Sequence, residues 1–443
     1  MEKKKKRKPQ KQKFLSPDKY VKERMRKLEI GDCFFSDDLL EHKFGFVFVT
    51  RRHNGGRISV ARYLVDMSCK GIVKSSFHLR LDSIEYAQII KTSILFVLFL
   101  FAPRVMAQDY TVSIQSLKGF PKDEQGIVQG VSACYAGSIG HTLVMAGGCN
   151  FPGVPAADGG AKRYYQGIYA ATPSSNDQLS WKRIGMLPVP AAYGASVSAG
   201  DGIICIGGMN GEGSLRAVFR ISLAEGRAVV DSLPSLPVPL DNLTAAMQSH
   251  RIMVRGGRFL LALDLLRPEA GWQTVGDGME MLQQPVSAFL DGQFCVWGGY
   301  TPKTPAAKAT LNMGGQSYGQ TVEDVAPPVD EQGETVFLGG AAAVNISGNK
   351  VVAMGGVNKE VFLRALNDPP SGYLRHPKEW YRFNPCIFVR DHDGWKLVGR
   401  SQATARAGAS LVACRNDIYV IGGELKPGIR TPEIVRLTIH ANN

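Results

Sequence analysis

The chain has 443 residues, of which 44% are hydrophobic and 21% are charged, an ordinary composition for a globular protein. These values exclude a multi-span membrane protein, a collagen-like fibre and a wholly disordered chain. The formal charge of +13 is unevenly placed, because residues 1–107 hold 23 of the 52 Lys and Arg residues and 11 of the 39 Asp and Glu residues. The remainder is nearly neutral, so we expect it to bind no nucleic acid.

The first residues form a region of different character. A basic block at residues 3–8 is typical of a solvated tail that is disordered in isolation. Residues 44–66 predict a β-hairpin, with two β-rich runs on either side of His53-Asn54-Gly55-Gly56. We expect residues 1–90 to be a basic N-terminal extension, either small α+β or disordered, that arises from a mis-called start or an accidental fusion.

Residues 91–107 have the pattern of a secretory signal. Lys91 precedes an apolar run from Ile94 to Ala102, and Val105-Met106-Ala107 follows it. The run has nine residues, whereas a membrane-spanning helix needs about 20. A buried core helix or strand is the alternative. We expect cleavage near Ala107, a periplasmic location and no stable membrane insertion of the mature chain, although about 90 residues precede the segment.

From residue 108 onward an apolar run ends in a pair of glycines six times. The first glycines of successive pairs are 55 residues apart on average, and six equal units of the 336-residue segment would have 56 residues each. Such regularity indicates a repeat architecture. The six pairs are Gly147-Gly148, Gly207-Gly208, Gly256-Gly257, Gly298-Gly299, Gly355-Gly356 and Gly422-Gly423.

Each repeat has the same internal order. A strand of small residues such as Gly194-Ala195-Ser196-Val197 is followed by a polar turn, an apolar strand and the glycine pair. Small side chains suit the crowded strand near a propeller axis. The pattern resembles the kelch repeat, with a period of about 50 residues and four-stranded blades. We therefore expect an all-β, six-bladed kelch β-propeller over residues 108–443. Thr111–Leu117 would complete the last blade beside Glu433–Ile439, which leaves no free edge. A β-sandwich would not explain six equal units.

The loops that follow the glycine pairs are expected to hold the site. Successive strands of a blade run antiparallel, so these six loops should meet on one face around one channel mouth. They offer a carboxylate, several cations, amides and aromatic rings, a set suited to an anionic sugar. The loops richest in these groups begin at Gly148, Gly356 and Gly423.

Two motifs in these loops are distinctive. They are Asn150-Phe151-Pro152-Gly153 and the closing run Gly423-Glu424-Leu425-Lys426-Pro427-Gly428-Ile429-Arg430-Thr431. Through them residues 128–440 resemble the kelch-type N-acetylneuraminate (sialic acid) mutarotases or epimerases, in a cyclically permuted branch. The closing motif lies mid-chain in unpermuted members. The resemblance implies an isomerase that interconverts the α and β anomers of N-acetylneuraminate without metal or cofactor, with Glu424 and Arg430 as the catalytic pair.

Mutarotation opens a hemiketal and closes it on the other face, which requires one group to accept a proton and another to donate one. Glu424 is the candidate proton carrier, and Arg430 would hold the carboxylate of the sugar acid. Asn150, Lys162 and Asn358 are candidate substrate-binding residues, although each could instead cap a turn. The simpler interpretation of Glu424 and Arg430 is a loop salt bridge worth at most ~1 kcal/mol.

Other functions remain open at this level. A non-catalytic kelch propeller that binds a glycan or a protein partner is the main alternative. Trp380 and Tyr381 are more typical of packing residues than of ligands. Eight cysteines without a CxxC motif predict neither a disulfide scaffold nor a zinc ribbon, and those after residue 108 read as small buried hydrophobic residues. A copper enzyme is disfavoured because the histidines after residue 108 have no ligand-like spacing. These are His141, His250, His376, His392 and His440.

Overall fold

The computed structural model describes most of the chain, in two compact units that comprise Met1–Ala107 and Gln108–Asn443. The described residues are 28–35, 44–53, 55–66, 71–90, 110–174, 177–303, 307–319 and 325–442. The basic block and the signal-like segment lie outside these ranges, so the predicted export stays a prediction. Within these ranges no helix is long and apolar enough to cross a bilayer.

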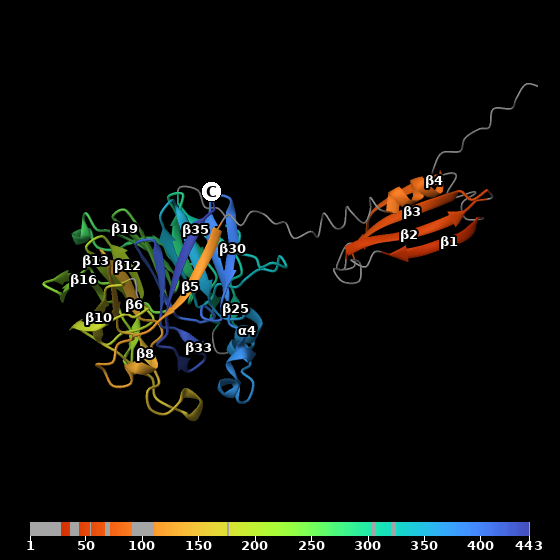
Figure 1. The fold of residues 1–443 in the computed structure, drawn as a ribbon. Helices are drawn as coiled ribbons and strands as arrows, with labels where there is room; N and C mark the ends of the chain where they lie inside the picture. Colours follow the sequence, from red (N-terminus) through yellow and green to blue (C-terminus); the bar gives the residue numbers. More distant parts are fainter. Residues whose placement is uncertain are drawn as a thin grey trace, which may run out of the picture. The chain divides into compact units, whose positions relative to one another are not determined.

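The N-terminal unit is an antiparallel four-stranded sheet in sequence order, followed by a helical segment at residues 83–90 (Figure 1). The predicted hairpin is confirmed, because the second and third strands pair along their whole length. Phe48 and Val60 form part of a small core on one face of this sheet. The strands are β1 (Glu29–Phe35), β2 (Phe44–Arg52), β3 (Ile58–Asp66) and β4 (Gly71–Leu81).

The second unit contains six antiparallel sheets of three or four strands within residues 110–442. In chain order their strands are β5 (Tyr110–Leu117), β6 (Tyr135–Ile139), β7 (Thr142–Ala146), β10 (Gly167–Ala171), β11 (Lys182–Met186), β12 (Ala195–Ala199), β13 (Gly202–Ile206), β16 (Val218–Ala224), β17 (Arg227–Ser232), β18 (Thr244–Gln248), β19 (Arg251–Gly256), β20 (Phe259–Asp264), β21 (Gln273–Gly276), β22 (Val286–Leu290), β23 (Gln293–Trp297), β26 (Gly315–Tyr318), β27 (Ala341–Ile346), β28 (Lys350–Gly355), β29 (Cys386–Asp391), β30 (Gly394–Arg400), β31 (Ser410–Cys414), β32 (Asp417–Ile421) and β35 (Ile434–Ala441).

One strand of each of these six sheets lies nearest the axis of the propeller. Each of these inner strands contacts the inner strand of the next sheet, and the last contacts the first, so the sheets form a closed circle. The inner strands are β6, β12, β18, β22, β27 and β31. The sheets are therefore the blades of a propeller, and the predicted all-β propeller fold is confirmed.

The last blade joins the two ends of this unit. Its order is β31-β32-β35-β5, so β5 from the start of the propeller forms the outermost strand beside β35 (Figure 1). The register pairs Val435 with Ser116 and Leu437 with Ile114. This is the arrangement that the sequence predicts, and it hydrogen-bonds an edge that would otherwise be exposed.

The core lies between neighbouring blades. The second strand of each blade is buried on both faces, as in β13, where all five residues are buried. Ile203 and Cys205 of this strand pack against Val144 and Ile168 of the blade before it. The cysteines after residue 108 are all buried and free, as predicted for small core residues.

The glycine pairs hold adjacent blades together as well as ending a strand. Gly355 has φ 72°, and a Cβ there would lie 2.4 Å from the carbonyl oxygen of Arg406, which belongs to the connection into the next blade. The N–H of Gly356 donates to that same carbonyl at 2.9 Å. Only glycine allows both the conformation and the close approach. The same bond joins Gly148 to Ala191, Gly208 to Leu240 and Gly423 to Val131.

The third pair departs from the pattern, which corrects the expectation of six loops. Gly256 ends β19, and β20 starts at Phe259 after a two-residue link. The buried side chain of Arg255 donates to the carbonyl of Gly257 at 2.7 Å and to that of Glu280 at 2.6 Å. This blade therefore turns back at once and contributes no long loop to the face.

A second ring of contacts surrounds the propeller axis. Just before each inner strand, one residue with φ between 50° and 67° donates its N–H to the carbonyl of the equivalent residue in the preceding blade, over 2.7–3.1 Å. The six bonds close on themselves. We call these residues the hub ring; they are Ala133, Tyr193, Asn242, Gln284, Gly340 and Gly408.

Short hairpins and helices extend from the face on which the hub ring lies. The hairpins pair β8 (Cys149–Asn150) with β9 (Arg163–Tyr164), β14 (Met209–Asn210) with β15 (Gly213–Ser214), β24 (Tyr300–Thr301) with β25 (Thr310–Leu311), and β33 (Glu424–Lys426) with β34 (Ile429–Arg430). Among the described residues, the helices on this face are α4 (Lys359–Asn367) and the short 3-10 turns Ile127–Gln129, Ala156–Asp158, Tyr373–Arg375 and Lys378–Tyr381, whereas the 3-10 turn Pro268–Ala270 joins β20 to β21 on the opposite face. In Figure 1, β8, β33 and α4 lie together at the lower end of the propeller.

Candidate active site

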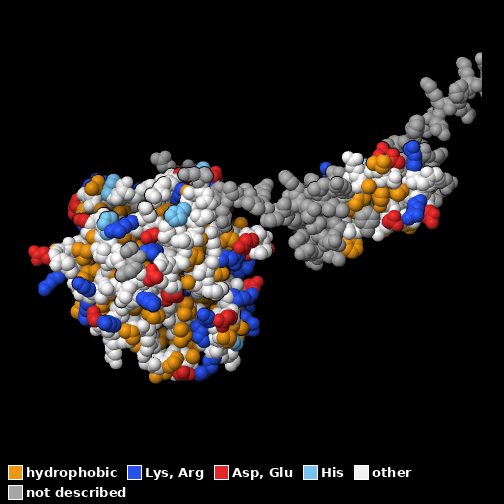
Figure 2. Space-filling model, viewed as in Figure 1, with side chains coloured by type: hydrophobic (Ala, Val, Ile, Leu, Met, Phe, Trp, Pro, Cys, Tyr) orange, Lys and Arg blue, Asp and Glu red, His pale blue; other side chains and the backbone are white. Residues whose placement is uncertain are grey.

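A cavity of about 410 Å³ opens over the hub ring, and all six ring residues line it. This volume lies within the range of small-molecule sites. Loops of the fifth and last blades form its walls, as the sequence predicts, whereas no residue of the first loop, 149–166, lines the cavity. Elsewhere on the propeller, acidic and basic side chains are mixed over the face shown in Figure 2.

Glu424 and Arg430 lie side by side at one end of this cavity. They are paired residues of the hairpin β33–β34, which turns through Pro427 and Gly428. Their side chains form an ion pair, with Glu424 Oε1 2.7 Å from Arg430 Nη1. The N–H of Gly428 also donates to Glu424 Oε1 at 2.8 Å. One carboxylate oxygen is therefore fixed by the hairpin itself, which leaves Oε2 to face a ligand.

The two members of the pair differ in exposure. The side chain of Glu424 is 23% exposed, whereas that of Arg430 is 3% exposed. The guanidinium of Arg430 is covered by its neighbours. Its Nε donates to Ser132 Oγ at 3.0 Å, and its central carbon is 4.9 Å from the ring centre of Phe151. Arg430 Nη1 has no well-aligned hydrogen-bond partner among the described residues, so its contact with Glu424 is mainly electrostatic.

The charge of Arg430 is held in place by its surroundings. Burial opposes the charged form, but the negative charge of Glu424, together with Tyr193 and Cys149, outweighs it and raises the pKa of the guanidinium. Arg430 therefore stays cationic although it is almost completely covered.

Tyr193 is a functional candidate that the motifs did not reveal. It is the second residue of the hub ring and lines the cavity. Lys162 Nζ donates to its hydroxyl at 3.0 Å and lies 4.7 Å from its ring centre. Burial raises the pKa of Tyr193 well above its ordinary value, and Cys149 and Glu424 raise it further, against the opposing effect of Arg430. The site thus places a protonated phenol between Lys162 and the Glu424–Arg430 pair.

The three candidate substrate-binding residues have different surroundings. Lys162 reaches the site through Tyr193, as described above. Asn358 lines the cavity, but its side chain accepts a hydrogen bond from Val361 N at 3.1 Å and caps the N-terminus of α4. Asn358 Oδ1 therefore makes the capping contact that the sequence left open as the alternative to sugar binding.

Asn150 lies beneath the site rather than in it. It is 1% exposed, its Nδ2 donates to the carbonyls of Gly126 and Gly130 at 2.9 and 2.8 Å, and its Oδ1 accepts from Tyr165 Oη at 2.8 Å. The amide is fully used in fixing the first loop to the segment before β6. This corrects the expectation that Asn150 contacts the sugar, because a buried and satisfied amide has no group to offer a ligand.

Aromatic residues after α4 pack under one wall. Tyr381 is fully buried and donates to the carbonyl of Tyr373, and Trp380 stacks on His376 with ring centres 4.0 Å apart. Lys426 Nζ donates to the carbonyl of His376 at 2.5 Å. Trp380 and Tyr381 are therefore packing residues, as predicted, and Lys426 ties the closing motif to this aromatic group.

Comparison with known proteins identifies the family. The profile of "NANM: N-acetylneuraminate epimerase" matches residues 103–230 and 233–443, which is more than half of the chain. The chain belongs to this family. The expected resemblance is thus confirmed at the level of the family, and the cyclic permutation stays a prediction.

Curated relatives in this family are bacterial proteins named N-acetylneuraminate epimerase. That of Salmonella enteritidis PT4 is 28% identical over 232 residues, which covers 46% of this chain and 58% of the relative. That of Haemophilus influenzae (strain PittEE) is 28% identical over 229 residues, 46% of this chain and 59% of the relative. The chain thus spans somewhat under two thirds of the length of the relatives it matches.

A solved structure shows the same fold. The structure titled "Structure of YjhT" is 14% identical, with a TM-score of 0.50, and the match covers 74% of this chain and 99% of that one. At this identity the likeness concerns the fold alone. It agrees with the propeller described for residues 110–442.

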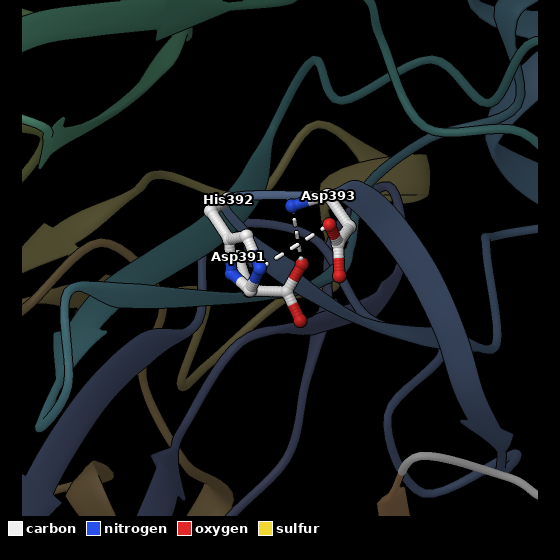
Figure 3. A group of neighbouring side chains, drawn as sticks. All are labelled: Asp391, His392 and Asp393. Carbon is white, nitrogen blue, oxygen red and sulfur yellow. Dashed lines mark hydrogen bonds and ion pairs between the residues drawn. The ribbon is translucent and has the colours of Figure 1, made fainter.

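Among the described residues, one group of potential metal ligands stands together, and it lies away from the cavity. Asp391, His392 and Asp393 form the turn between β29 and β30, where His392 Nε2 is 3.2 Å from Asp393 Oδ1 (Figure 3). Lys396 Nζ lies 3.0 Å from Asp391 Oδ2 and 3.5 Å from Asp393 Oδ2, so a cation already contacts both carboxylates. Tyr110 also donates to Asp391 at 2.9 Å. We therefore interpret this group as the attachment of β5 to the neighbouring blade through Tyr110, and not as a metal centre.

The residues that sequence reasoning missed share one signal. Tyr193, Asn242 and Gln284 each stand just before the small-residue strand of a repeat. Superposing the repeats on these strands would have aligned all six hub-ring positions, where the side chains differ from blade to blade.

Proposed function

We propose that this protein is a sialic acid mutarotase that interconverts the α and β anomers of N-acetylneuraminate. The observation that carries the proposal is the Glu424–Arg430 pair at the hub cavity, with a partly exposed carboxylate held by a buried guanidinium. The names of the curated relatives support the choice of sugar acid.

The reaction needs a proton acceptor and a proton donor. Glu424 Oε2 takes the proton of the anomeric hydroxyl, and the bond between the anomeric carbon and the ring oxygen breaks as that oxygen receives a proton from the hydroxyl of Tyr193. The open-chain ketone and a free hydroxyl result. Rotation of the carbonyl and the reverse proton transfers then close the ring on the other face.

Burial favours a revised role for Arg430. Its Nε and Nη1 already face Ser132 and Glu424, so a two-pronged grip on the substrate carboxylate would require at least one of these contacts to change. We assign Arg430 to positioning Glu424. Lys162, which is partly exposed and hydrogen-bonded to Tyr193, is the cation that would meet the carboxylate of the sugar.

The test uses freshly released α-N-acetylneuraminate and the purified full-length chain. Proton NMR follows the two anomers, and acceleration over the uncatalysed exchange is the expected result. Calorimetric binding of the sugar without acceleration would instead support the alternative, a non-catalytic propeller that binds a glycan. If the sugar is not bound and its anomer exchange is not accelerated, the proposal is refuted.

A further inference from the structure

The hub ring provides six equivalent backbone positions whose side chains can be compared directly. All six are in the left-handed conformation, which is strained for most residues other than glycine. Gly340 and Gly408 meet this requirement without strain. Asn242 and Gln284 have φ of 50° and 52°, so the third and fourth blades keep amide side chains where glycine would be more stable. A side chain kept at a strained backbone position suggests a functional role, so its contacts are described next.

The two amides form a chain with a defined orientation. Asn242 Nδ2 donates to Asp241 Oδ1 at 2.5 Å, and Gln284 Nε2 donates to Asn242 Oδ1 at 3.1 Å. The other oxygen of Asp241 accepts from Ser214 Oγ. A carboxylate can only accept, so it fixes which end of each amide faces the next. Gln284 Oε1 is left as an acceptor, and it lies 3.4 Å from the place where a Cβ of Gly340 would be.

These amides lie across the cavity from the proposed catalytic pair. Both line the cavity, as does Glu424. In the order of the circle, the blade of Asn242 is third and the blade of Glu424 is last, so the two are on opposite sides of the hub. The cavity therefore has a charged end and a neutral amide end. Apolar side chains, among them Val357 and Phe362, form a wall between them.

The chemistry of the amide end matches hydroxyl groups. A hydroxyl donates and accepts, and so does a carboxamide, whereas an acetamido methyl group would suit the apolar wall. We propose that Asn242 and Gln284 are specificity-determining residues that bind the hydroxyl-bearing tail of a nine-carbon keto-sugar acid. The inference rests on the proposed function for the placement of the anomeric centre at Glu424.

The experiment compares two sugars with two ring variants of the full-length chain. The sugars are N-acetylneuraminate and its analogue shortened by two carbons at the tail, which keeps the anomeric centre and the acetamido group. Gln284→Gly removes the amide without straining the backbone, and Ala133→Gly is the matched control at an equivalent ring position. We expect Gln284→Gly to lower kcat/KM and the binding constant for the full-length sugar about tenfold, with little effect on the shortened one. Ala133→Gly should preserve the preference.

The outcomes separate this inference from the proposed function. Calorimetric preference for the longer sugar that disappears in Gln284→Gly, without any acceleration of anomer exchange, would support the amide end and refute the mutarotase. If the wild-type chain accelerates anomer exchange and Gln284→Gly lowers the rate equally for both sugars, or lowers it for neither sugar, the inference is overturned. The proposed mutarotase function is then unaffected. Failure of the wild-type chain to bind either sugar would overturn both.

Discussion

The two faces of the propeller are built from the same repeats but are connected differently. On the face away from the cavity, the first two strands of every blade are joined by two or three residues. On the cavity face, the links after the glycine pairs range from two residues after Gly256 to the 30 residues that separate β28 from β29. The short turns only close the repeat, so they can be alike, while the long loops must each supply different side chains.

The left-handed residues show the same contrast. Gly200 has φ 62° and open space around it on the far face. On the cavity face, by contrast, the first glycine of five of the six pairs has a backbone atom of the connection into the next blade within 3 Å of where a Cβ would lie. One face therefore uses glycine for a turn alone, and the other uses it for the turn and for the joint between blades. Four experiments test the roles assigned to the two faces.

The largest effect is expected at the charged end of the cavity. Glu424→Gln removes the proton acceptor and keeps the shape, so the acceleration of anomer exchange should fall by about 10² to 10⁴. Glu212→Gln, in an exposed hairpin of the second blade, is the control that should leave the rate unchanged. Equal rates for wild type and Glu424→Gln in the NMR assay would remove Glu424 from the mechanism.

The second effect concerns stability. Gly355→Ala places a Cβ 2.4 Å from the Arg406 carbonyl oxygen at φ 72°, so we expect the free energy of unfolding to fall by about 3 kcal/mol or more. Gly200→Ala meets only the left-handed strain and should cost about 1–2 kcal/mol. Denaturant titrations of the two variants measure the difference. Similar losses would show that the glycine pairs do not act as joints between blades.

The third effect is a dependence of stability on alkaline pH. Burial, with Tyr381 and Glu424, raises the pKa of Tyr373 to about 12 from the ordinary value of 10.0. A raised pKa in the folded state stabilises the fold fully below the unfolded value, so this contribution should be lost as the pH rises from 10 through 12. Thermal unfolding should show Tm falling over that window, and falling less in Tyr373→Phe. An identical fall in the variant would assign it to other groups.

The smallest effect is expected from metal removal. Asp391, His392 and Asp393 lie at the β29–β30 turn, where the Lys396 ammonium group already contacts both carboxylates. A chelator should therefore change neither Tm nor the rate of anomer exchange. Loss of either on dialysis against a chelator, with recovery on adding back a divalent cation, would contradict the assignment of this turn as an anchor for β5.

Local sequence was sufficient for the architecture because the repeat is a local pattern. Six glycine pairs at regular spacing indicated the blades, and Thr111–Leu117 indicated the strand that closes the last one. The closing motif also predicted Glu424 and Arg430 close together, because a Pro427-Gly428 turn can fold both side chains towards one site, and the two residues are paired in the hairpin. The third blade could not be anticipated in the same way, since its glycine pair is followed by residues that read like any other loop.

The amino-acid sequence was therefore enough to predict the blades and the pairing of Glu424 with Arg430. The contacts of each side chain became known from the folded structure: Asn150 is buried and satisfied, Arg430 is more deeply buried than Glu424, and Tyr193 accepts a hydrogen bond from Lys162. Burial and orientation depend on contacts between blades more than forty residues apart in the chain. The hub ring shows this most clearly, because its six hydrogen bonds arise only when the circle is closed.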